Sequence, residues 1–194
     1  EPVKIVGHSP DTSVISHGNS GVMGMNLTAN RSASDFEIRN VKFEVSGSNN
    51  AFSGRILEIC GIVSNCVFKG KTVGTGNNSG FSGAVRLLAG SRMIDSTVEQ
   101  LAGKWNSVSS KGIEIAGGGV IVDRCVVRNV TDQCGSGATL PTTVGVTGVF
   151  TPAPIIRNCY VAHNVCEGSA AEFGAIGLLG PAVVENCTIV SNVS

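Results

Sequence analysis

The sequence predicts an all-β fold in which the chain winds into a parallel β-helix, or β-solenoid, with three short strands per coil. Two observations support this prediction: a ten-residue unit recurs along the chain, and a short apolar run bounded by glycine lies upstream of it. A third is that no convincing helical stretch separates the copies, which argues against a sheet of β-α-β units. Repetition at a fixed period is typical of solenoids, so the repeats decide the fold class.

The recurring unit is clearest at residues 155–164 (IIRNCYVAHN) and 183–192 (VVENCTIVSN), which begin 28 residues apart. Its core reads apolar–x–Asn–Cys–x–apolar, and looser copies carry other residues at the Asn and Cys positions. The Cys position falls at residues 41, 66, 96, 125, 159 and 187, so neighbouring copies are 25 to 34 residues apart. This spacing predicts about six to seven coils.

Each unit consists of two short strands joined by a corner. Ile156 and Cys159 are both expected to point inward, yet they are three residues apart, so the period of two breaks once between them. Asn158 lies at the break, and asparagine is, after glycine, the residue that best tolerates the left-handed conformation of such a bend. The sequence therefore predicts a stack of corner residues, of which Asn186 is expected to be inaccessible. The asparagines of this stack are Asn40, Asn65, Asn158 and Asn186.

The third strand of each coil is predicted by the upstream apolar runs, because short runs bounded by glycine are typical of strands. These runs occupy residues 54–61, 83–90, 112–117, 145–149 and 174–180. Near the start of the chain, residues 2–7 and 13–16 are expected to form two further strands. Successive coils are expected to stack at about 4.8 Å, the normal spacing between strands.

On these repeats the chain resembles the right-handed parallel β-helix class, the pectate-lyase-like superfamily. The stacked corner asparagines resemble the asparagine ladder of that class. Residues 83–85 (GAV) and 174–176 (GAI), with Val161-x-x-Asn164 and Ile189-x-x-Asn192, resemble the GGAI and FxxN repeats of bacterial polymorphic outer-membrane proteins and of large bacterial surface proteins. The resemblance covers nearly the whole chain and implies an extracellular or cell-surface location. It names no activity, because the class includes lyases, hydrolases, epimerases, tailspikes and adhesins.

The length of 194 residues predicts a single domain over residues 1–194. A net charge of zero, with 14% charged residues, argues against a nucleic-acid partner. The sequence contains no run of 18 apolar residues, so membrane insertion of this segment is not expected. Neither end shows the polar cap that solenoids need for solubility. We therefore expect either a slab of a longer solenoid or a subunit whose open ends self-associate end to end.

Weak catalytic candidates appear when the third strands are aligned on their glycines. Glu58, Arg86 and Glu114 then occupy equivalent outward positions, 28 residues apart, and the next two coils offer Thr147 and Gly177. Lyases that share the resembled fold use acidic residues and an Arg or Lys on this face. The favoured interpretation is an exposed charge ladder whose alternating signs avoid repulsion between coils, so no catalytic residue is assigned.

The chain has seven cysteines, four of which share one inward position. These are expected to form a stack of small buried side chains, since free cysteine behaves as a small hydrophobe; they are Cys66, Cys125, Cys159 and Cys187. Cys134 and Cys166 lie in expected loops of adjacent coils and are the best candidates for a disulfide. Whether they are bonded is left open.

No spacing of His, Cys or Asp matches a zinc or calcium site, so the sequence predicts neither a metal nor a cofactor. His163 is expected to be an outward residue in a strand. Insertions on one face of a solenoid often form its binding face. Trp105, the only tryptophan, lies in such an expected loop at residues 99–111 and is a candidate binding residue; residues 69–82 and 131–143 are similar loops.

Two hypotheses for the function remain. The favoured one is a structural or adhesive β-helix module of a secreted or cell-surface bacterial protein, acting as a stalk or presenting a face that binds glycans or proteins. The alternative is a non-catalytic or partial segment of a polysaccharide lyase or hydrolase that acts on acidic glycans. An ice-binding role is disfavoured, because it needs a flat array of outward threonines that the sequence does not show.

Overall fold

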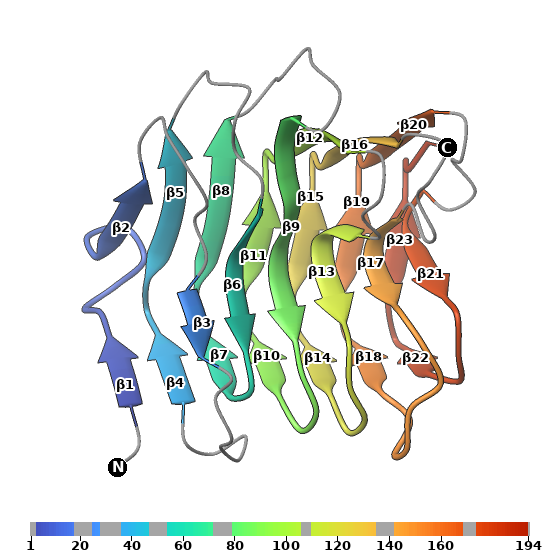
Figure 1. Cartoon of the computed structure of the whole chain (residues 1–194), viewed down its shortest axis with the longest axis horizontal. Coiled ribbons are helices and arrows are strands. Elements are labelled where there is room, and N and C mark those ends of the chain that lie inside the picture. Colours follow the sequence, from blue (N-terminus) through green and yellow to red (C-terminus); the bar gives the residue numbers. More distant parts are fainter. Residues whose placement is uncertain are drawn as a thin grey trace.

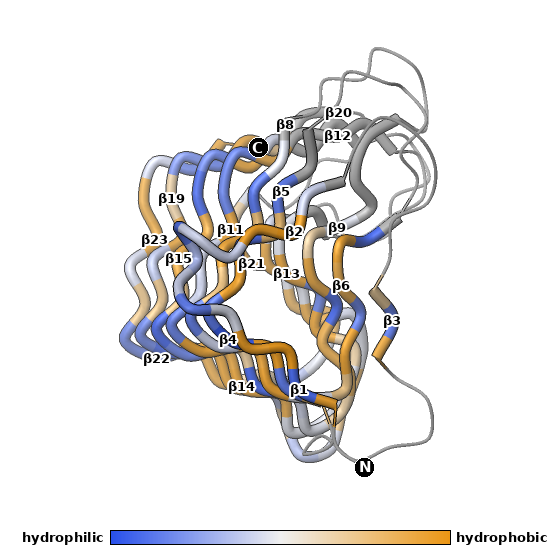
Figure 2. The backbone as a smooth tube through the Cα atoms, turned by 90° about the vertical axis from the view of Figure 1, so that its left-hand side faces the viewer, coloured by the Kyte–Doolittle hydropathy of each residue, from blue (hydrophilic) through white to orange (hydrophobic). Residues whose placement is uncertain are grey.

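The computed structural model describes residues 3–17, 25–27, 36–46, 54–71, 79–105, 110–134, 142–168 and 174–193. Within them every regular element is a β-strand, and the strands form three sheets around one interior (Figures 1 and 2). Neighbouring strands in each sheet come from successive turns of the chain, so the predicted all-β solenoid is confirmed. This part of the chain holds no helix with the length and apolarity of a membrane span.

The first and second sheets each contain seven parallel strands among the described residues. The first sheet comprises β1 (Val3–Val6), β4 (Phe36–Arg39), β7 (Ile62–Ser64), β10 (Arg92–Ile94), β14 (Ile121–Asp123), β18 (Ile155–Arg157) and β22 (Val183–Glu185). The second comprises β2 (Val14–His17), β5 (Lys42–Ser46), β8 (Val67–Lys71), β11 (Thr97–Glu99), β15 (Val126–Arg128), β19 (Tyr160–Ala162) and β23 (Thr188–Val190).

The third sheet contains a parallel run of β3 (Met25–Leu27), β6 (Gly54–Ile59), β9 (Ser79–Leu87), β13 (Ser110–Ile115), β17 (Thr142–Val146) and β21 (Ile176–Leu178). The expected run at residues 145–149 was therefore placed too late, since β17 begins at Thr142 and ends at Val146. Glycine alignment misplaced it because Gly145 lies inside the strand, opposite Glu114 of β13, rather than at its start.

The number of coils differs slightly from the expected six to seven. Four consecutive turns, which begin at β4, β7, β10 and β14, have all three strands paired on both sides within the described residues. The first turn is paired on one side only, and the turn that begins at β22 has two described strands instead of three. The third sheet therefore stops one strand short of the other two.

The corner between the first and second sheets is a single residue in the left-handed region, as predicted. Its φ lies between 48° and 57° in all six copies of the unit, at Asn40, Asn65, Asp95, Arg124, Asn158 and Asn186. The corner therefore keeps its backbone conformation even where Asp or Arg replaces asparagine. A second left-handed corner follows the second sheet, at Gln100, Asn129, His163 and Ser191. His163 is thus an exposed corner residue and not, as expected, part of a strand.

The core is one continuous column of side chains from successive coils. Ile38, Val63, Met93, Val122 and Ile156 lie in register on adjacent strands of the first sheet, and all are buried. In the second sheet the rings of Phe43 and Phe68 stack, with centroids 5.0 Å apart. Each fully buried side chain of this size contributes about 1.5–3 kcal/mol.

The solenoid also has strands where the sequence predicted loops. β12 (Ala102–Trp105), β16 (Thr131–Cys134) and β20 (Val165–Gly168) pair in parallel, and β12 joins the start of β9 in antiparallel fashion. β12 and β16 lie within the expected loops at residues 99–111 and 131–143, and β20 contains Cys166, which was also expected to lie in a loop. Sequence reasoning missed them because their residues show little apolar alternation, so it is pairing with the neighbouring coil that makes them strands.

Candidate functional site

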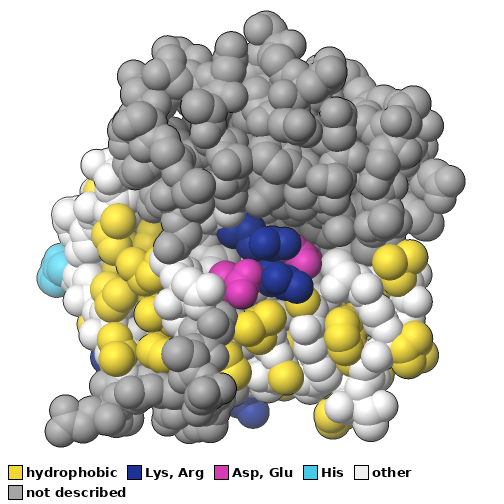
Figure 3. All heavy atoms as spheres, in the orientation of Figure 1, with side chains coloured by type: hydrophobic (Ala, Val, Ile, Leu, Met, Phe, Trp, Pro, Cys, Tyr) yellow, Lys and Arg dark blue, Asp and Glu magenta, His cyan; other side chains and the backbone are white. Residues whose placement is uncertain are grey.

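Three charged residues predicted to be neighbours stand side by side on the third sheet. Glu58 on β6, Arg86 on β9 and Glu114 on β13 are direct partners in the register of these strands. Arg86 Nη1 lies 3.3 Å from Glu58 Oε2, and Arg86 Nε lies 3.1 Å from Glu114 Oε1, an ion pair whose angle is too poor for a hydrogen bond. Figure 3 shows basic and acidic side chains gathered on this face.

Arg55 is a fourth member of this cluster, which sequence reasoning missed. Its Nε and Nη2 atoms donate to Glu114 Oε2 over 2.9 and 2.6 Å, and its Nη1 lies 3.8 Å from Glu58 Oε2. Strict alternation would place Arg55 and Glu58 on opposite faces of β6, because they are three residues apart. The alternation breaks between them, because Ile56 and Leu57 are both buried, an irregularity that the sequence did not signal.

The cluster ends at Glu114. Gly145 and Gly177 continue its column on β17 and β21, whereas the sequence alignment had assigned Thr147 to that position. Thr147 instead follows β17, and both its main-chain N–H and its hydroxyl donate to the carbonyl of Ile115. No side chain beyond the four charged residues therefore extends the column toward β21.

The two arginines and two glutamates of the cluster neutralise one another. The Glu114 side chain is only 5% exposed, and its carboxylate contacts both Arg55 and Arg86. A general base needs a carboxylate that can reach a substrate proton, and recognition of an acidic sugar needs positive charge that is not already compensated. This geometry favours a structural role for the cluster, in holding coils together, over a catalytic role. Among the described residues, no group of three or more His, Cys, Asp or Glu could hold a metal ion.

A similar alternation of charge runs along the second sheet. Glu44, Lys69, Glu99 and Arg128 are successive partners in the strand register. Arg128 donates to Glu99 Oε2 from Nη2 and Nε, over 2.7 and 3.0 Å, while Lys69 Nζ lies 3.9 Å from Glu99 Oε1. Charges of unlike sign on adjacent coils thus recur on a second face of the molecule, as expected for a structural ladder.

The first corner carries a third network, centred on the buried Asp123. Arg124 Nη1 and Arg157 Nη2 each lie 3.0 Å from Asp123 Oδ2, and Asn158 Nδ2 donates to Asp123 Oδ1 over 2.9 Å. The hydrogen bond from Asn158, helped by Arg157 and Arg124, outweighs burial and lowers the pKa of Asp123. Arg124 also pairs with Asp95 on the preceding coil and lowers the pKa of that carboxyl.

The predicted asparagine stack is made of local contacts rather than one continuous chain of amides. Asn65 Nδ2 donates to Asn40 Oδ1 over 2.9 Å, and Asn40 Nδ2 donates to the carbonyl of Gly7 over 3.2 Å. Asn158 bonds a carboxylate instead. Asn186 is exposed, which contradicts the expectation that it is inaccessible. The corner side chains lie at the surface even in inner coils, since Asn65 and Asn158 are exposed as well.

A second pair of asparagines lies inside the solenoid, beside the second corner. The Oδ1 of Asn164 accepts from the N–H of Val130, and its Nδ2 donates to the carbonyl of Val127. The Oδ1 of Asn192 accepts from both the main-chain N–H and the Nδ2 of Asn164. The sequence singled out these residues only as part of a repeat, yet they link three successive coils through buried hydrogen bonds.

The four cysteines of the repeated unit carry free thiols at one position of the coil. Cys66, Cys125 and Cys159 are buried, and Cys187 is half-buried at the last turn. Each thiol donates to the carbonyl two residues earlier, as the Ser96 hydroxyl does at the same position. Burial raises the pKa of Cys66, while the shared hydrogen bond with Cys159, together with burial, raises the pKa of Cys125. The same hydrogen bond outweighs burial at the other thiol and lowers the pKa of Cys159 to about 7.

The remaining candidates fall partly outside the described residues. Trp105 ends β12 and Cys134 ends β16, but their side chains lie outside the described part of the structure. Cys134 and Cys166 lie in strands and not, as expected, in loops. The register places Cys134 opposite Gly168 and Cys166 opposite Asp132, an offset of two residues. Their pairing and a binding role for Trp105 stay predictions.

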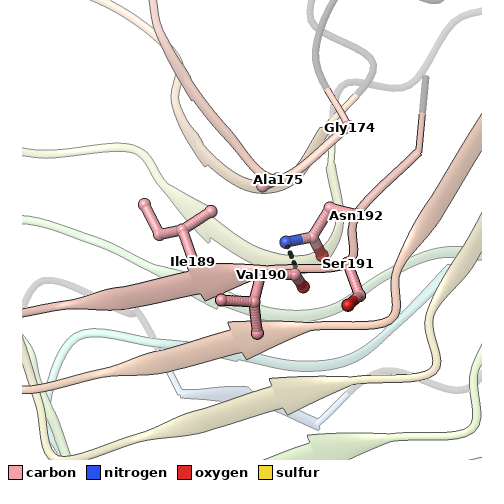
Figure 4. Close-up of a pocket in the computed structure, with 6 residues that line it drawn as sticks. All are labelled: Gly174, Ala175, Ile189, Val190, Ser191 and Asn192. Atoms are coloured by element: carbon pink, nitrogen blue, oxygen red, sulfur yellow. Dashed lines mark hydrogen bonds between the residues drawn. The ribbon is translucent and has the colours of Figure 1, made fainter.

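A hollow of about 290 Å³ opens at the end of the solenoid formed by the last coil (Figure 4). It lies between the start of β21 and the end of β23, and is lined by Gly174, Ala175, Ile189, Val190, Ser191 and Asn192. Asn192 Nδ2 already donates to the carbonyls of Val161 and Val190, over 2.8 and 3.0 Å. The hollow is separate from the charge cluster, and none of the predicted site residues lines it.

Together, the stacked parallel sheets, the left-handed corners and the ion pairs between coils define a parallel β-solenoid. Compared with known proteins, the chain matches no protein-family model, no curated protein and no solved structure. The class of protein therefore rests on the geometry.

Proposed function

We propose that this chain is a structural or adhesive β-solenoid module of a secreted or cell-surface bacterial protein. It acts as a stalk, or as a rigid support whose face binds a glycan or another protein. The bacterial and cell-surface part of the proposal rests on the resemblance of the repeats. The structural part rests on the side chains.

One observation carries the proposal: on three separate faces, charged side chains form ion pairs with charged side chains of adjacent coils. The Glu58–Arg86–Glu114 cluster, the Glu99–Arg128 ladder and the Asp123 network all follow this pattern. Such pairs favour the correct register of coils, and they leave little unpaired charge for binding an ionic substrate. A surface of this kind suits a rigid support.

The test is a screen of immobilised glycans and host-surface proteins with the purified chain, followed by analysis of the retained material. Retention without cleavage is expected for an adhesive module, and no retention with a rigid, extended shape is expected for a stalk. Formation of shortened glycans in the same screen contradicts both forms of the proposal.

The alternative is a partial segment of a polysaccharide lyase or hydrolase that acts on acidic glycans. Its support is the Arg86 side chain, one-third exposed and flanked in register by two carboxylates. An absorbance assay for unsaturated uronate products tests it, with Arg86→Ala as the variant and Arg92→Ala on β10 as the matched control. Product formation abolished only by Arg86→Ala establishes the enzyme and removes the structural proposal.

A further inference from the structure

We propose that Cys125 and Cys159 form an oxidisable thiol pair, which hydrogen peroxide converts into a disulfide between two neighbouring coils. The charge networks that carry the proposed function include neither thiol. The inference therefore holds whether the solenoid acts as a stalk, an adhesin or an enzyme segment.

The two cysteines are direct neighbours in the stack of coils. Each precedes the first residue of its strand, β15 or β19, and those first residues, Val126 and Tyr160, are partners in the register. The N–H of Tyr160 donates to the carbonyl of Cys125 over 2.9 Å. Adjacent strands lie about 4.8 Å apart, which falls within the Cα separations of roughly 4.4–6.8 Å that a disulfide spans.

The thiol of Cys159 is held toward the coil of Cys125. Cys159 Sγ donates to the carbonyl of Arg157 over 3.1 Å, and lies 3.7 Å from the carbonyl of Val122 on the coil of Cys125. The hydrogen bond that the two thiols share lowers the pKa of Cys159 to about 7 and, with burial, raises the pKa of Cys125. The thiolate is the nucleophilic form of cysteine, so Cys159 is the thiol that reacts first.

The other two cysteines at this position of the coil lack the same combination of contacts. Cys66 is buried, but its neighbours on the adjacent coils are Val41 and Ser96, so it has no thiol beside it. Cys187 adjoins Cys159 on the other side, yet burial is the main cause of its raised pKa and its side-chain hydrogen bond with Cys159 contributes less. Cys66 is thus an internal control, and Cys187 is a competing partner.

The oxidation balances with hydrogen peroxide as the sole oxidant. The Cys159 thiolate attacks one oxygen of the peroxide, the O–O bond breaks, and the departing hydroxide takes up a proton to become water. The thiol of Cys125 then attacks the sulfur of the resulting sulfenic acid and expels a second hydroxide, which takes up the Cys125 proton. Two thiols are oxidised to one disulfide, and one peroxide is reduced to two molecules of water. The bond joins two coils that otherwise share only non-covalent contacts.

The test treats the reduced, folded 194-residue chain with hydrogen peroxide at pH 7. The remaining thiols are then alkylated in denaturant, and mass spectrometry of the digested chain locates every cross-link. The expected product is a link between Cys125 and Cys159 that dithiothreitol reverses. The Cys159 thiol is expected to disappear about tenfold faster than the Cys66 thiol, which has no neighbouring thiol.

Two matched variants identify the partner of Cys159. Cys125→Ser is expected to abolish the link and to leave a sulfenic acid on Cys159 that dimedone traps, whereas Cys187→Ser is expected to leave the link intact. Serine fits this position, because the Ser96 hydroxyl donates to a carbonyl there. Circular dichroism before treatment checks that both variants fold. The proposal is overturned if Cys159 and Cys66 oxidise at the same rate, if no link forms, or if Cys159 is linked to any cysteine other than Cys125.

Discussion

At the scale of single residues, one backbone conformation organises the fold. The left-handed corner recurs after the first sheet in every copy of the unit, whether its residue is Asn, Asp or Arg. Because this one residue breaks the alternation of the two strands, Ile156 and Cys159 can both point inward although they are three residues apart. The corner and the inward thiol can be tested separately.

The corner predicts a difference between two substitutions of Asn158, whose φ is 55°. Asn158→Gly keeps the left-handed conformation but loses the hydrogen bond to Asp123, whereas Asn158→Val loses both. We expect the valine variant to be less stable than the glycine variant by about 1–2 kcal/mol. Chemical denaturation measures both. Equal stabilities contradict the idea that the backbone conformation constrains this position.

The buried thiol position predicts a second difference. Cys159→Asp places an unpaired carboxylate in the core and is expected to cost several kcal/mol. Cys159→Ser is expected to cost about 1 kcal/mol, because Ser96 shows that a hydroxyl at the equivalent position finds a carbonyl acceptor. Thermal unfolding of both variants is the measurement, and similar melting temperatures mean that the side chain does not point inward.

At the scale of elements, the contacts between neighbouring coils decide stability. The described strands have three to nine residues and are too short to be stable alone, so each depends on the neighbouring coils. Those contacts are of two kinds: close packing of the turns that join the third sheet to the first, and ion pairs between charged residues on adjacent strands.

The turns predict opposite tolerance at two nearby glycines. A Cβ at Gly117 overlaps the main chain of Ala89 on the neighbouring coil, whereas a Cβ at Gly119 makes only an ordinary van der Waals contact with the ring of Pro152. Gly117→Ala is therefore expected to cost about 3 kcal/mol. Gly119→Ala, strained only by its φ of +68°, is expected to cost about 1–2 kcal/mol. Denaturant titration compares the two, and the reverse order contradicts the stacking of the turns.

The ion pairs predict how stability depends on pH. The native pKa of Asp123 lies below that of the unfolded chain, so its contribution is present above about pH 4 and is lost as the pH falls through the native pKa. Unfolding free energies measured from pH 6 down to pH 2 are expected to fall less steeply in Asp123→Asn than in the wild type. Asp11→Asn, in the exposed turn after β1, is the control for the loss of one surface carboxylate.

At the scale of the whole molecule, the two ends of the described solenoid differ from its middle. Three inward positions at these ends, Val3, Val184 and Ile189, are exposed. Their register partners on the next coil are all buried, at Phe36, Ile156 and Val161. Exposed strand edges with apolar side chains are templates for pairing. The 194-residue chain is therefore expected to associate end to end.

The prediction is that the average mass of the 194-residue chain rises with concentration. Ile189→Lys is expected to raise the concentration needed for association at least tenfold, because it places a charge in the contact. Tyr160→Lys changes a similarly exposed residue on the outer face of β19 and is expected to have little effect. Light scattering across a dilution series measures both. A chain that stays monomeric at its highest concentration contradicts end-to-end association.

The sequence by itself determined the period of the solenoid, the position of the corner and the inward stack of cysteines. These features are local: one left-handed residue between two short apolar alternations recurs in each copy, so it can be found without knowing which coils touch. The register of Glu58, Arg86 and Glu114 was also predictable, because their strands have similar spacing and begin near glycines.

Only the tertiary structure decided the features that depend on the neighbouring coil. Arg55 joins the charge cluster because the alternation of β6 breaks beside it, β12 becomes a strand by pairing, and Gly145 takes the place expected for Thr147. The inner pair of Asn164 and Asn192 shows its role only once their coils are stacked. Hydrogen bonds and ion pairs between coils join residues about 28 positions apart, and a shift of one residue in register redirects each side chain to the other face.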